Sequence, residues 1–406
     1  MKIKPFAALR PPKELADLVA SVPYDVVDTD QARVLAGGND KSFLHVVKPE
    51  IDLPEGTDLY ADVVYEKAAA NFKSFQDEGL LVRDAKPCIY VYRQELKDHS
   101  QTGLVVACHR DDYENEVIKK HEKTLKKKED DRTRHVKTLR ANAGPVFLMY
   151  RGVEAVNAMV ADAQTGTPDY DFIAEDNVRH TAWVIEDTDA LVAAFDQIPF
   201  SYVADGHHRS ASASRVGMEM AAANPNHTGD ENYNWFLTVL FPAEDLQVLA
   251  YNRLVTNLND LSAAEVLARV GEAFTVEETS EPLPDRREKF CMYLDGKWYA
   301  LTWETDASLD PVARLDVSVL QNRLLQPILG VDDVRTDPRM IFKGGFGVTD
   351  VMKNLVDAGT AAVAFSLYPV GVDQVMDVAD AGEIMPPKST WFEPKLRSGL
   401  FVHTLD

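Results

Sequence analysis

The amino-acid sequence predicts a mixed α/β (α+β) protein, and three observations support that fold class. Short apolar runs typical of strands alternate with segments whose apolar residues recur every three or four positions, as on one face of a helix. Glycine, proline and Asp-Gly pairs separate these segments. The composition, 45% hydrophobic and 27% charged, is that of a globular protein and excludes a largely disordered chain.

The expected elements follow from these patterns in chain order. The clearest helix is residues 60–76, where Tyr60, Val64, Phe72 and Phe75 share one face before Gly79 ends it. Further helices are expected at residues 189–197, 207–223, 263–274, 317–329 and 349–358. Strands are expected at residues 88–92, 103–107, 145–150, 180–185, 200–204, 235–241, 246–255 and 361–370, with a hairpin over 290–303 that turns at Asp295-Gly296.

The length of the chain, 406 residues, is sufficient for two domains. A polar segment at residues 224–232, which contains Pro225 and Gly229, is the best candidate boundary. We therefore expect a first domain at residues 1–225 and a C-terminal α/β region at residues 226–406 that completes the functional site.

The charge of the chain restricts its partners. The formal net charge is −22, so phosphate backbones and anionic membranes repel the protein as a whole. The most apolar stretch, residues 361–372, is shorter than the roughly 20 residues that a membrane span needs and is interrupted by Pro369. No apolar signal core follows the first residues. We expect a cytoplasmic protein that binds neither nucleic acid nor membrane.

The turn Asp205-Gly206-His207-His208-Arg209 is the strongest candidate site. It links a buried strand to a helix, and Gly206 lets the backbone approach a ligand closely. The N–H groups at the start of that helix favour an anion such as phosphate, which Arg209 can clamp. His207 and His208 can donate hydrogen bonds or move protons. The alternative is a plain helix cap by Asp205 with histidines on the surface, and we favour the phosphate site.

A basic run at residues 119–128 is the second candidate. On a helix His121, Thr124 and Lys128 would share a face. Glu122, a carboxylate within this basic run, can act as a base or bind a metal ion. The alternative is a solvated, salt-bridged helix surface, which the spacing alone favours.

Two further segments carry candidate groups. Asp25 follows Pro23 and Tyr24, so it lies near a turn, where it can meet a cation or simply cap backbone amides. Lys388, Ser389 and Thr390 form a compact donor set that can hold a phosphate or a carboxylate, or belong to a polar loop near the C-terminus.

Taken together, these segments resemble the bacterial and archaeal family catalogued as domain of unknown function 1015. The resemblance covers nearly the whole chain, from about residue 3 to about residue 402. The motifs that carry it are Pro5-Phe6, Pro23-Tyr24-Asp25-Val26, His121-Glu122-Lys123-Thr124, Asp131-Arg132, Ala204-Asp205-Gly206-His207-His208-Arg209, Tyr368-Pro369-Val370 and Met385-Pro386-Pro387-Lys388-Ser389-Thr390.

That family is similar, through the Asp-Gly-His-x-Arg turn, to the partition-protein/sulfiredoxin-like superfamily, which includes free serine kinases. The resemblance implies a partition-protein/sulfiredoxin-like core and a nucleotide, ADP or ATP with Mg²⁺. Asp205, Gly206, His207, His208 and Arg209 would bind the phosphates, and serine or phosphoserine would be the substrate. The implied catalytic residues are Glu122, Asp25, His208 and His121, with Asp25 or Glu122 as metal ligands; Thr124, Lys388, Ser389 and Thr390 would bind the substrate.

We therefore expect a phosphotransferase that moves a phosphoryl group between ADP or ATP and serine or phosphoserine, in either direction. One alternative is a phosphoserine phosphatase, with water as the acceptor. The other is a non-enzymatic nucleotide-binding module like those of partition proteins, although the charge and the lack of a basic recognition helix argue against DNA.

Overall fold

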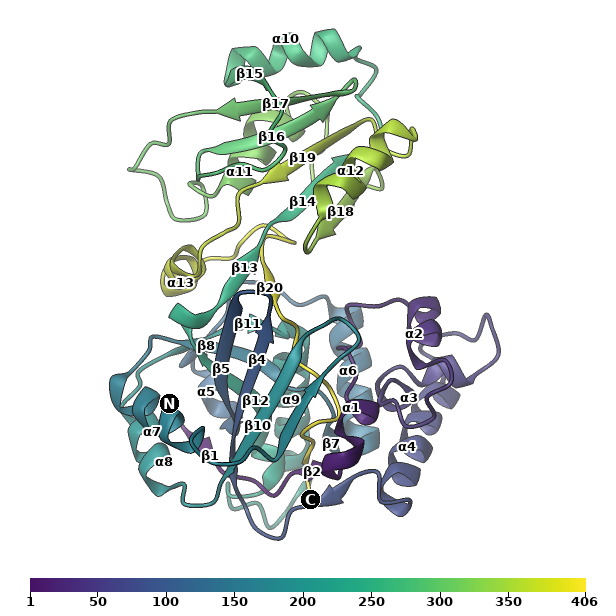
Figure 1. The fold of residues 1–406 in the computed structure, drawn as a ribbon, viewed down its shortest axis with the longest axis vertical. Helices are drawn as coiled ribbons and strands as arrows, with labels where there is room; N and C mark the ends of the chain where they lie inside the picture. The colour runs from purple at the N-terminus through teal and green to yellow at the C-terminus, as the bar shows by residue number, and fades with distance from the viewer. The chain divides into compact units, whose positions relative to one another are not determined.

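The computed structural model describes residues 1–406, which form two compact units (Figure 1). Unit 1 comprises Met1–Leu246 and Pro394–Asp406, and unit 2 comprises Gln247–Glu393. Both units contain helices and strands, so the expected mixed α+β class is confirmed. None of the helices has the length and apolarity that crossing a bilayer demands.

Unit 1 is built on a nine-stranded sheet. The strands follow the order β6-β11-β8-β12-β5-β4-β10-β9, and β1 pairs with β5 beside this path. The pairs β11–β6 and β12–β8 are parallel and the others antiparallel. The strands are β1 (Ile3–Lys4), β4 (Ile89–Leu96), β5 (His99–His109), β6 (Ile118–Lys119), β8 (Val146–Tyr150), β9 (Tyr170–Ile173), β10 (Arg179–Ile185), β11 (Ser201–Asp205) and β12 (Trp235–Pro242).

The helices of unit 1 bury several apolar cores, of which two are large. One core joins the sheet to α7 and α8, where Val156 and Phe195 are fully buried. The other lies among α2, α3 and α4, around Phe43 and Phe72. The helices are α1 (Ala16–Val19), α2 (Thr29–Ala36), α3 (Leu44–Val47), α4 (Asp62–Asp77), α5 (Arg110–Glu114), α6 (Lys126–Leu139), α7 (Glu154–Ala163), α8 (Asp189–Asp196) and α9 (His207–Ala223).

The end of the chain belongs to unit 1. Strand β21 (His403–Thr404) pairs with β7 (Ala141–Asn142), and another small ladder joins β2 (Leu9–Arg10) to β3 (Val82–Arg83). Single bridges join Val402 to Leu9 and Ser398 to Ser21. Along the chain, unit 2 is therefore an insertion between two parts of unit 1.

Unit 2 has an antiparallel six-stranded sheet in the order β15-β17-β16-β19-β14-β18. Its strands are β14 (Tyr251–Val255), β15 (Thr275–Thr279), β16 (Lys289–Leu294), β17 (Lys297–Thr302), β18 (Met340–Gly344) and β19 (Val363–Leu367), and β13 (Gln247–Leu249) pairs separately with β20 (Trp391–Glu393). Its helices are α10 (Ala263–Ala273), α11 (Asp316–Leu320), which continues as one π-helical stretch over Gln321–Leu325, α12 (Val348–Asp357) and α13 (Val372–Asp380).

Several sequence expectations need adjustment. The observed division differs from the expected boundary at residue 225, because β12 pairs with β5 and β8 and so belongs to the unit 1 sheet. The strand expected at residues 246–255 is two strands, β13 and β14, which pair with different partners. The helical face expected for His121, Thr124 and Lys128 was wrong. Helix α6 begins only at Lys126, residues 120–125 form no regular element, and the Leu125 N–H donates to the His208 side chain of α9.

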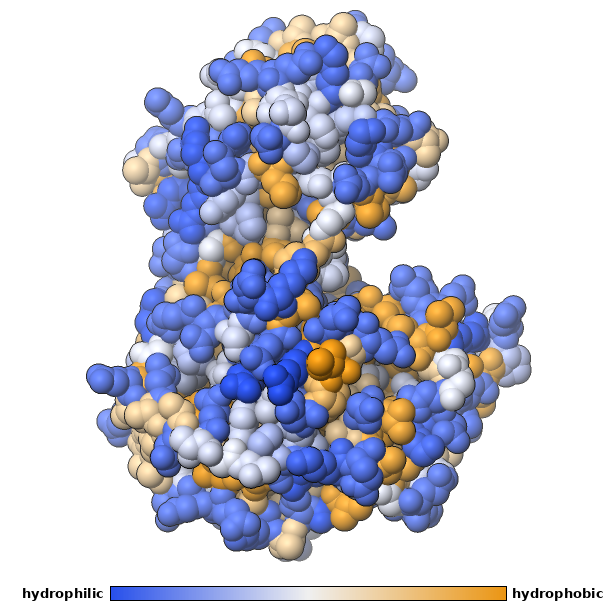
Figure 2. Space-filling model, viewed as in Figure 1, coloured by the Kyte–Doolittle hydropathy of each residue, from blue (hydrophilic) through white to orange (hydrophobic).

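The surface seen in Figure 2 is mainly hydrophilic, with hydrophobic residues in scattered groups. Large apolar side chains that are exposed along the chain include Val34, Ile173 and Phe346. Isolated exposures of this kind are ordinary for a globular protein.

Candidate phosphate-binding site

The turn between β11 and α9 has the geometry that its sequence predicts. Gly206 has φ 98° and ψ 31°, in the left-handed region, and α9 begins at the next residue. No side chain caps this helix N-terminus. A Cβ atom at position 206 would lie 3.1 Å from Nε of Arg209. Both the backbone conformation and the neighbouring guanidinium group therefore require glycine here.

Arg209 is almost completely buried beside this glycine. Its Nη1 donates to the carbonyl oxygen of Pro145, and its Nη2 donates to Oδ2 of Asp205 at 3.0 Å. Its buried Nε has no hydrogen-bond partner. Two of the three guanidinium nitrogens are thus already engaged within the protein, and Nε is the donor left unsatisfied. The expected clamp of Arg209 on a phosphate stays a prediction.

Two carboxylates lie against Arg209. Asp25 is the second, with its Oδ2 at 3.9 Å from Nη2. Burial opposes the ionisation of Asp205, but the positive charges of Lys395, whose Nζ lies 3.9 Å from Oδ2, and of Arg209 hold the pKa of Asp205 below its ordinary value. Lys395 lies shortly after the last sequence motif, which ends at Thr390, but nothing in that spacing indicated that the returning C-terminal segment brings it to Asp205.

Two buried imidazoles lie at the start of α9. The rings of His121 and His207 are edge to face, with centroids 4.5 Å apart. Burial lowers the pKa of His121 to about 4 and that of His207 well below its ordinary value, so both are neutral at pH 7. Both ring nitrogens of His121 and Nε2 of His207 are buried without a hydrogen-bond partner. Unsatisfied buried polar atoms are uncommon, and here they gather next to an uncapped helix.

The segment that follows His121 crosses the same turn. Oε2 of Glu122 lies 3.8 Å from Nδ1 of His207, which is no salt bridge at neutral pH because the imidazole is uncharged. The Leu125 N–H donates to Nε2 of His208 at 3.0 Å, which places the proton of His208 on Nδ1. Thr124 donates from Oγ1 to Glu129 at 2.9 Å. The structure therefore brings together three motifs that lie far apart in the sequence, those of Asp25, Glu122 and Gly206.

The remaining expected residues lie in unit 2. Ser389 donates from Oγ to the carbonyl oxygen of Pro386 at 2.6 Å, and Nζ of Lys388 lies 5.3 Å from the ring centroid of Tyr251. The substrate-binding role of Lys388, Ser389 and Thr390 stays a prediction. Nowhere are three His, Cys, Asp or Glu side chains grouped so that they could hold a metal ion.

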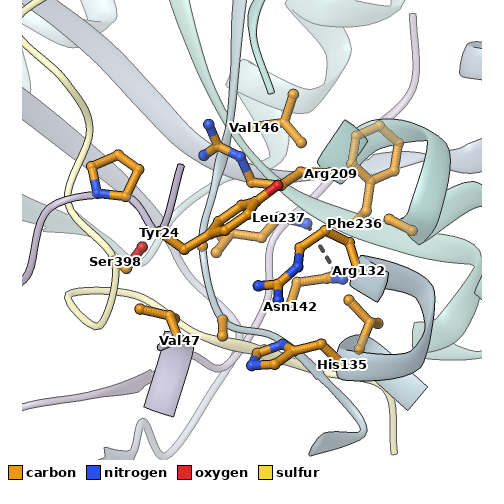
Figure 3. Close-up of a pocket in the computed structure, with 15 residues that line it drawn as sticks. Tyr24, Val47, Arg132, His135, Asn142, Val146, Arg209, Phe236, Leu237 and Ser398 are labelled. Atoms are coloured by element: carbon orange, nitrogen blue, oxygen red, sulfur yellow. Dashed lines mark hydrogen bonds between the residues drawn. The ribbon is translucent and has the colours of Figure 1, made fainter. Parts of the chain in front are cut away.

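A small cavity adjoins Arg209 within unit 1 (Figure 3). Arg132 of α6 and Arg209 of α9 reach it from two helices, and Tyr24 lies between them and Ser398. The guanidinium of Arg132 lies 4.1 Å from the ring centroid of Tyr24 and 2.8 Å from Asp131. The volume is about 40 Å³, enough for a water molecule or two but not for a nucleotide. The motif Asp131-Arg132 signalled these residues, but not that Arg132 would lie near the phosphate turn.

Comparison with solved structures gives distant likenesses. A free serine kinase in complex with AMP is similar over 73% of this chain and 91% of its own, at 15% identity and a TM-score of 0.39. A conserved hypothetical protein from Pyrococcus furiosus is similar over 73% and 94%, at 14% identity and a TM-score of 0.38. SbnI with a C-terminal truncation, from Staphylococcus aureus, is similar over 73% and 86%, at 10% identity and a TM-score of 0.34.

All three TM-scores lie below 0.5, so these likenesses do not establish the function of this chain. No curated protein sequence matched it. A family sequence model described as "Protein of unknown function (DUF1015)" matches residues 3–318, well over half of the chain, and the chain therefore belongs to that family.

Proposed function

We propose that this protein is a nucleotide-dependent phosphotransferase that moves a phosphoryl group between ADP or ATP and the side-chain oxygen of serine. The observation that carries the proposal is the turn at Gly206. It presents a helix N-terminus that no side chain caps, beside the buried cation Arg209 and next to imidazoles with unpartnered nitrogens. Backbone N–H groups at a helix start and a neighbouring cation are what phosphate binding requires.

The turn would hold the nucleotide phosphates through its backbone N–H groups, with the unsatisfied Nε of Arg209 as a further donor. Phosphoryl transfer depends mostly on positioning and on neutralising negative charge. The neutral His121 and His207 leave that part of the site uncharged at pH 7, so the cationic charge comes from Arg209 and Lys395.

Glu122 is our candidate for the general base. It is partly exposed and lies 3.8 Å from Nδ1 of His207, next to the turn. In the kinase direction it takes the proton of the serine hydroxyl while the serine oxygen attacks the γ-phosphorus of ATP and the bond to the β-phosphate oxygen breaks, which releases ADP. In the reverse direction an ADP oxygen attacks phosphoserine, and protonated Glu122 returns the proton to the departing serine oxygen.

Asp25 is our candidate for a metal ligand. Magnesium is usually held by one or two carboxylates together with substrate phosphates, so a three-residue cluster is not required. Asp25 fits because its carboxylate lies by the turn at 3.9 Å from Arg209 and makes no other close ionic contact. When bound, Mg²⁺ would neutralise phosphate charge. Serine is proposed as the substrate on the resemblance of the motifs.

The reaction can be tested directly with purified protein, phosphoserine and Mg²⁺, with and without ADP. We expect serine and ATP to form in equal amounts and only when ADP is present. Serine release without ADP would replace the proposal with the phosphatase alternative. Nucleotide binding with no turnover in either direction would favour the non-enzymatic nucleotide-binding module.

The roles of the two carboxylates can be separated by isosteric variants. We expect Glu122→Gln to lower kcat by about 10²–10⁴, the usual contribution of a general base, with little change in the Kd for ADP. Asp25→Asn should instead weaken the dependence of turnover on Mg²⁺. Glu116→Gln is the matched control, because Glu116 only pairs with Lys120. If Glu122→Gln turns over at the control's rate, Glu122 is not the base.

A further inference from the structure

A second cavity lies within unit 2, and none of its lining residues belongs to the phosphate turn. Its volume is about 260 Å³, below the roughly 300–1,000 Å³ of pockets for drug-sized ligands, so it suits a small metabolite. Its wall is formed by the segment before β16, the segment between β17 and α11, and helix α13. The lining residues are Arg287, Glu288, Thr305, Ala307, Pro311, Arg314, Asp316, Asp373, Gln374 and Asp377.

Arg314 gives the cavity a guanidinium group with an unused donor. Its Nε is buried and has no hydrogen-bond partner, and no carboxylate forms a close ion pair with it. By contrast Arg287, the other arginine of the lining, is paired with Asp373 at 2.7 Å. A guanidinium that is partly buried and unpaired is a site for a carboxylate, which it can bind through two parallel hydrogen bonds.

Asp316 gives the same cavity a carboxylate that is only 7% exposed. One of its oxygens accepts the N–H of Glu288 at 3.2 Å, and the other makes no hydrogen bond within the protein. Burial raises the pKa of Asp316 to about 7, since no cation lies close enough to compensate fully. An ammonium group in the cavity would supply that missing counter-charge.

We infer that this cavity binds a free α-amino acid as its zwitterion, with the carboxylate on Arg314 and the ammonium group on Asp316. The cavity contains one guanidinium without an ion-pair partner and one carboxylate without a close cation. These two groups match the carboxylate and the ammonium group that every α-amino acid carries. Asp377 adds a further carboxylate to the lining.

The charges of the lining residues also predict which amino acids bind more tightly. The lining holds two arginines and four carboxylates. When the Arg287–Asp373 ion pair is left out, the remaining charged lining residues, one arginine and three carboxylates, carry a net negative charge. Amino acids with basic or neutral side chains should therefore bind more tightly than glutamate or aspartate. This inference does not rest on the proposed function, since no residue of the phosphate turn takes part in it.

The experiment is calorimetric titration of the full chain with lysine, serine, alanine and glutamate, and with propylamine and propionate as half-ligands. We expect lysine or a neutral amino acid to bind, glutamate to bind at least about tenfold more weakly, and neither half-ligand to bind measurably. Binding of propylamine as tight as that of alanine would overturn the zwitterion assignment, as would the absence of binding by any amino acid.

Two variants locate the site. Arg314→Gln removes the cation, and Asp316→Asn keeps the size of the side chain and an oxygen that can accept the Glu288 N–H. Each should weaken amino-acid binding at least about tenfold, while ADP affinity stays unchanged. Arg335→Gln and Asp332→Asn are controls, because both residues are exposed in unit 2 and neither lines the cavity. Equal loss in the controls, or no loss in Arg314→Gln, would refute the assignment, with circular dichroism used to verify folding in each case.

Discussion

Two helices of this protein begin directly after a glycine in the left-handed region, one in each unit. Gly206, with φ 98°, precedes α9, and Gly347, with φ 65°, precedes α12. Neither helix has a side-chain cap at its N-terminus. By backbone geometry alone, both turns offer unpaired N–H groups and the positive end of a helix dipole.

The side chains around the two turns differ. A Cβ at position 206 would meet the guanidinium of Arg209, whereas a Cβ at position 347 would meet nothing within 4 Å. The first turn of α12 carries Asp350, an acid that already balances the dipole, and the first turn of α9 carries no acid. The proposed phosphate site is therefore distinguished by its buried cation and imidazoles, because a glycine before a helix occurs at both turns.

The largest expected effect comes from Gly206→Ala. The methyl group would displace the Arg209 guanidinium and strain the positive φ, so ADP binding should weaken on the order of 10²–10³-fold, the scale for losing a preorganised donor to phosphate charge. Gly347→Ala should cost only about 1 kcal/mol of stability and leave ADP affinity within about twofold. Calorimetry measures the ADP affinity and the stability of each folded variant. If Gly206→Ala and Gly347→Ala bind ADP equally tightly, the two turns do not differ as proposed.

The two units should also respond oppositely to acid. All ten histidines lie in unit 1. The pKa of buried His121 is lowered to about 4, so on acidification the unfolded chain takes up the proton first and stability is lost between pH 6.5 and 4. In unit 2 the pKa of Asp316 is raised to about 7, so the folded state takes up the proton first and stability is gained between pH 7 and 3.8.

From pH 7 to pH 5 we expect unit 1 to lose on the order of 2 kcal/mol through His121 and unit 2 to gain a similar amount through Asp316. Amide hydrogen exchange, corrected for its intrinsic pH dependence, measures the stability of each unit separately. His121→Asn should reduce the acid loss in unit 1 and Asp316→Asn the gain in unit 2. Parallel changes in both units would contradict this assignment.

The smallest expected effect is that of Asp350→Asn. It removes the acidic charge from the first turn of α12 and should lower stability by about 0.5 kcal/mol at low salt, with less effect at high salt. Thermal unfolding at two salt concentrations measures this. A gain of measurable ADP affinity in this variant would mean that Asp350 alone had kept the second turn from binding phosphate.

Local features of the site could be predicted from the sequence. The mixed fold class and the start of α9 directly after Gly206 follow from a buried strand, a glycine and an alanine-rich helix, all within one stretch of chain. The conformation of residues 120–125 could not be predicted in this way. Helical spacing suggested a shared helical face, but these residues form an irregular segment that is tied to α9 by a tertiary hydrogen bond from Leu125 to His208.

Long-range placement was also beyond the sequence. Asp25, Glu122 and Lys395 lie far apart along the chain, and the tertiary fold brings them to the same turn. The hydrogen bond of Arg209 to the Pro145 carbonyl depends on a neighbouring loop that carries no recognised motif, whereas its bond to Asp205 lies within the turn itself. The family resemblance pointed to most of these residues without indicating which of them would touch.

The return of the C-terminal segment to unit 1 has a consequence for biosynthesis. Lys395, which compensates the charge of Asp205, and the strand that pairs with β7 both leave the ribosome after all of unit 2. Until these residues have been synthesised, the buried Asp205 lacks the positive charge of Lys395 and is compensated by Arg209 alone. A chain truncated within unit 2 would therefore contain the turn at Gly206 without part of the charge that surrounds it in the folded protein.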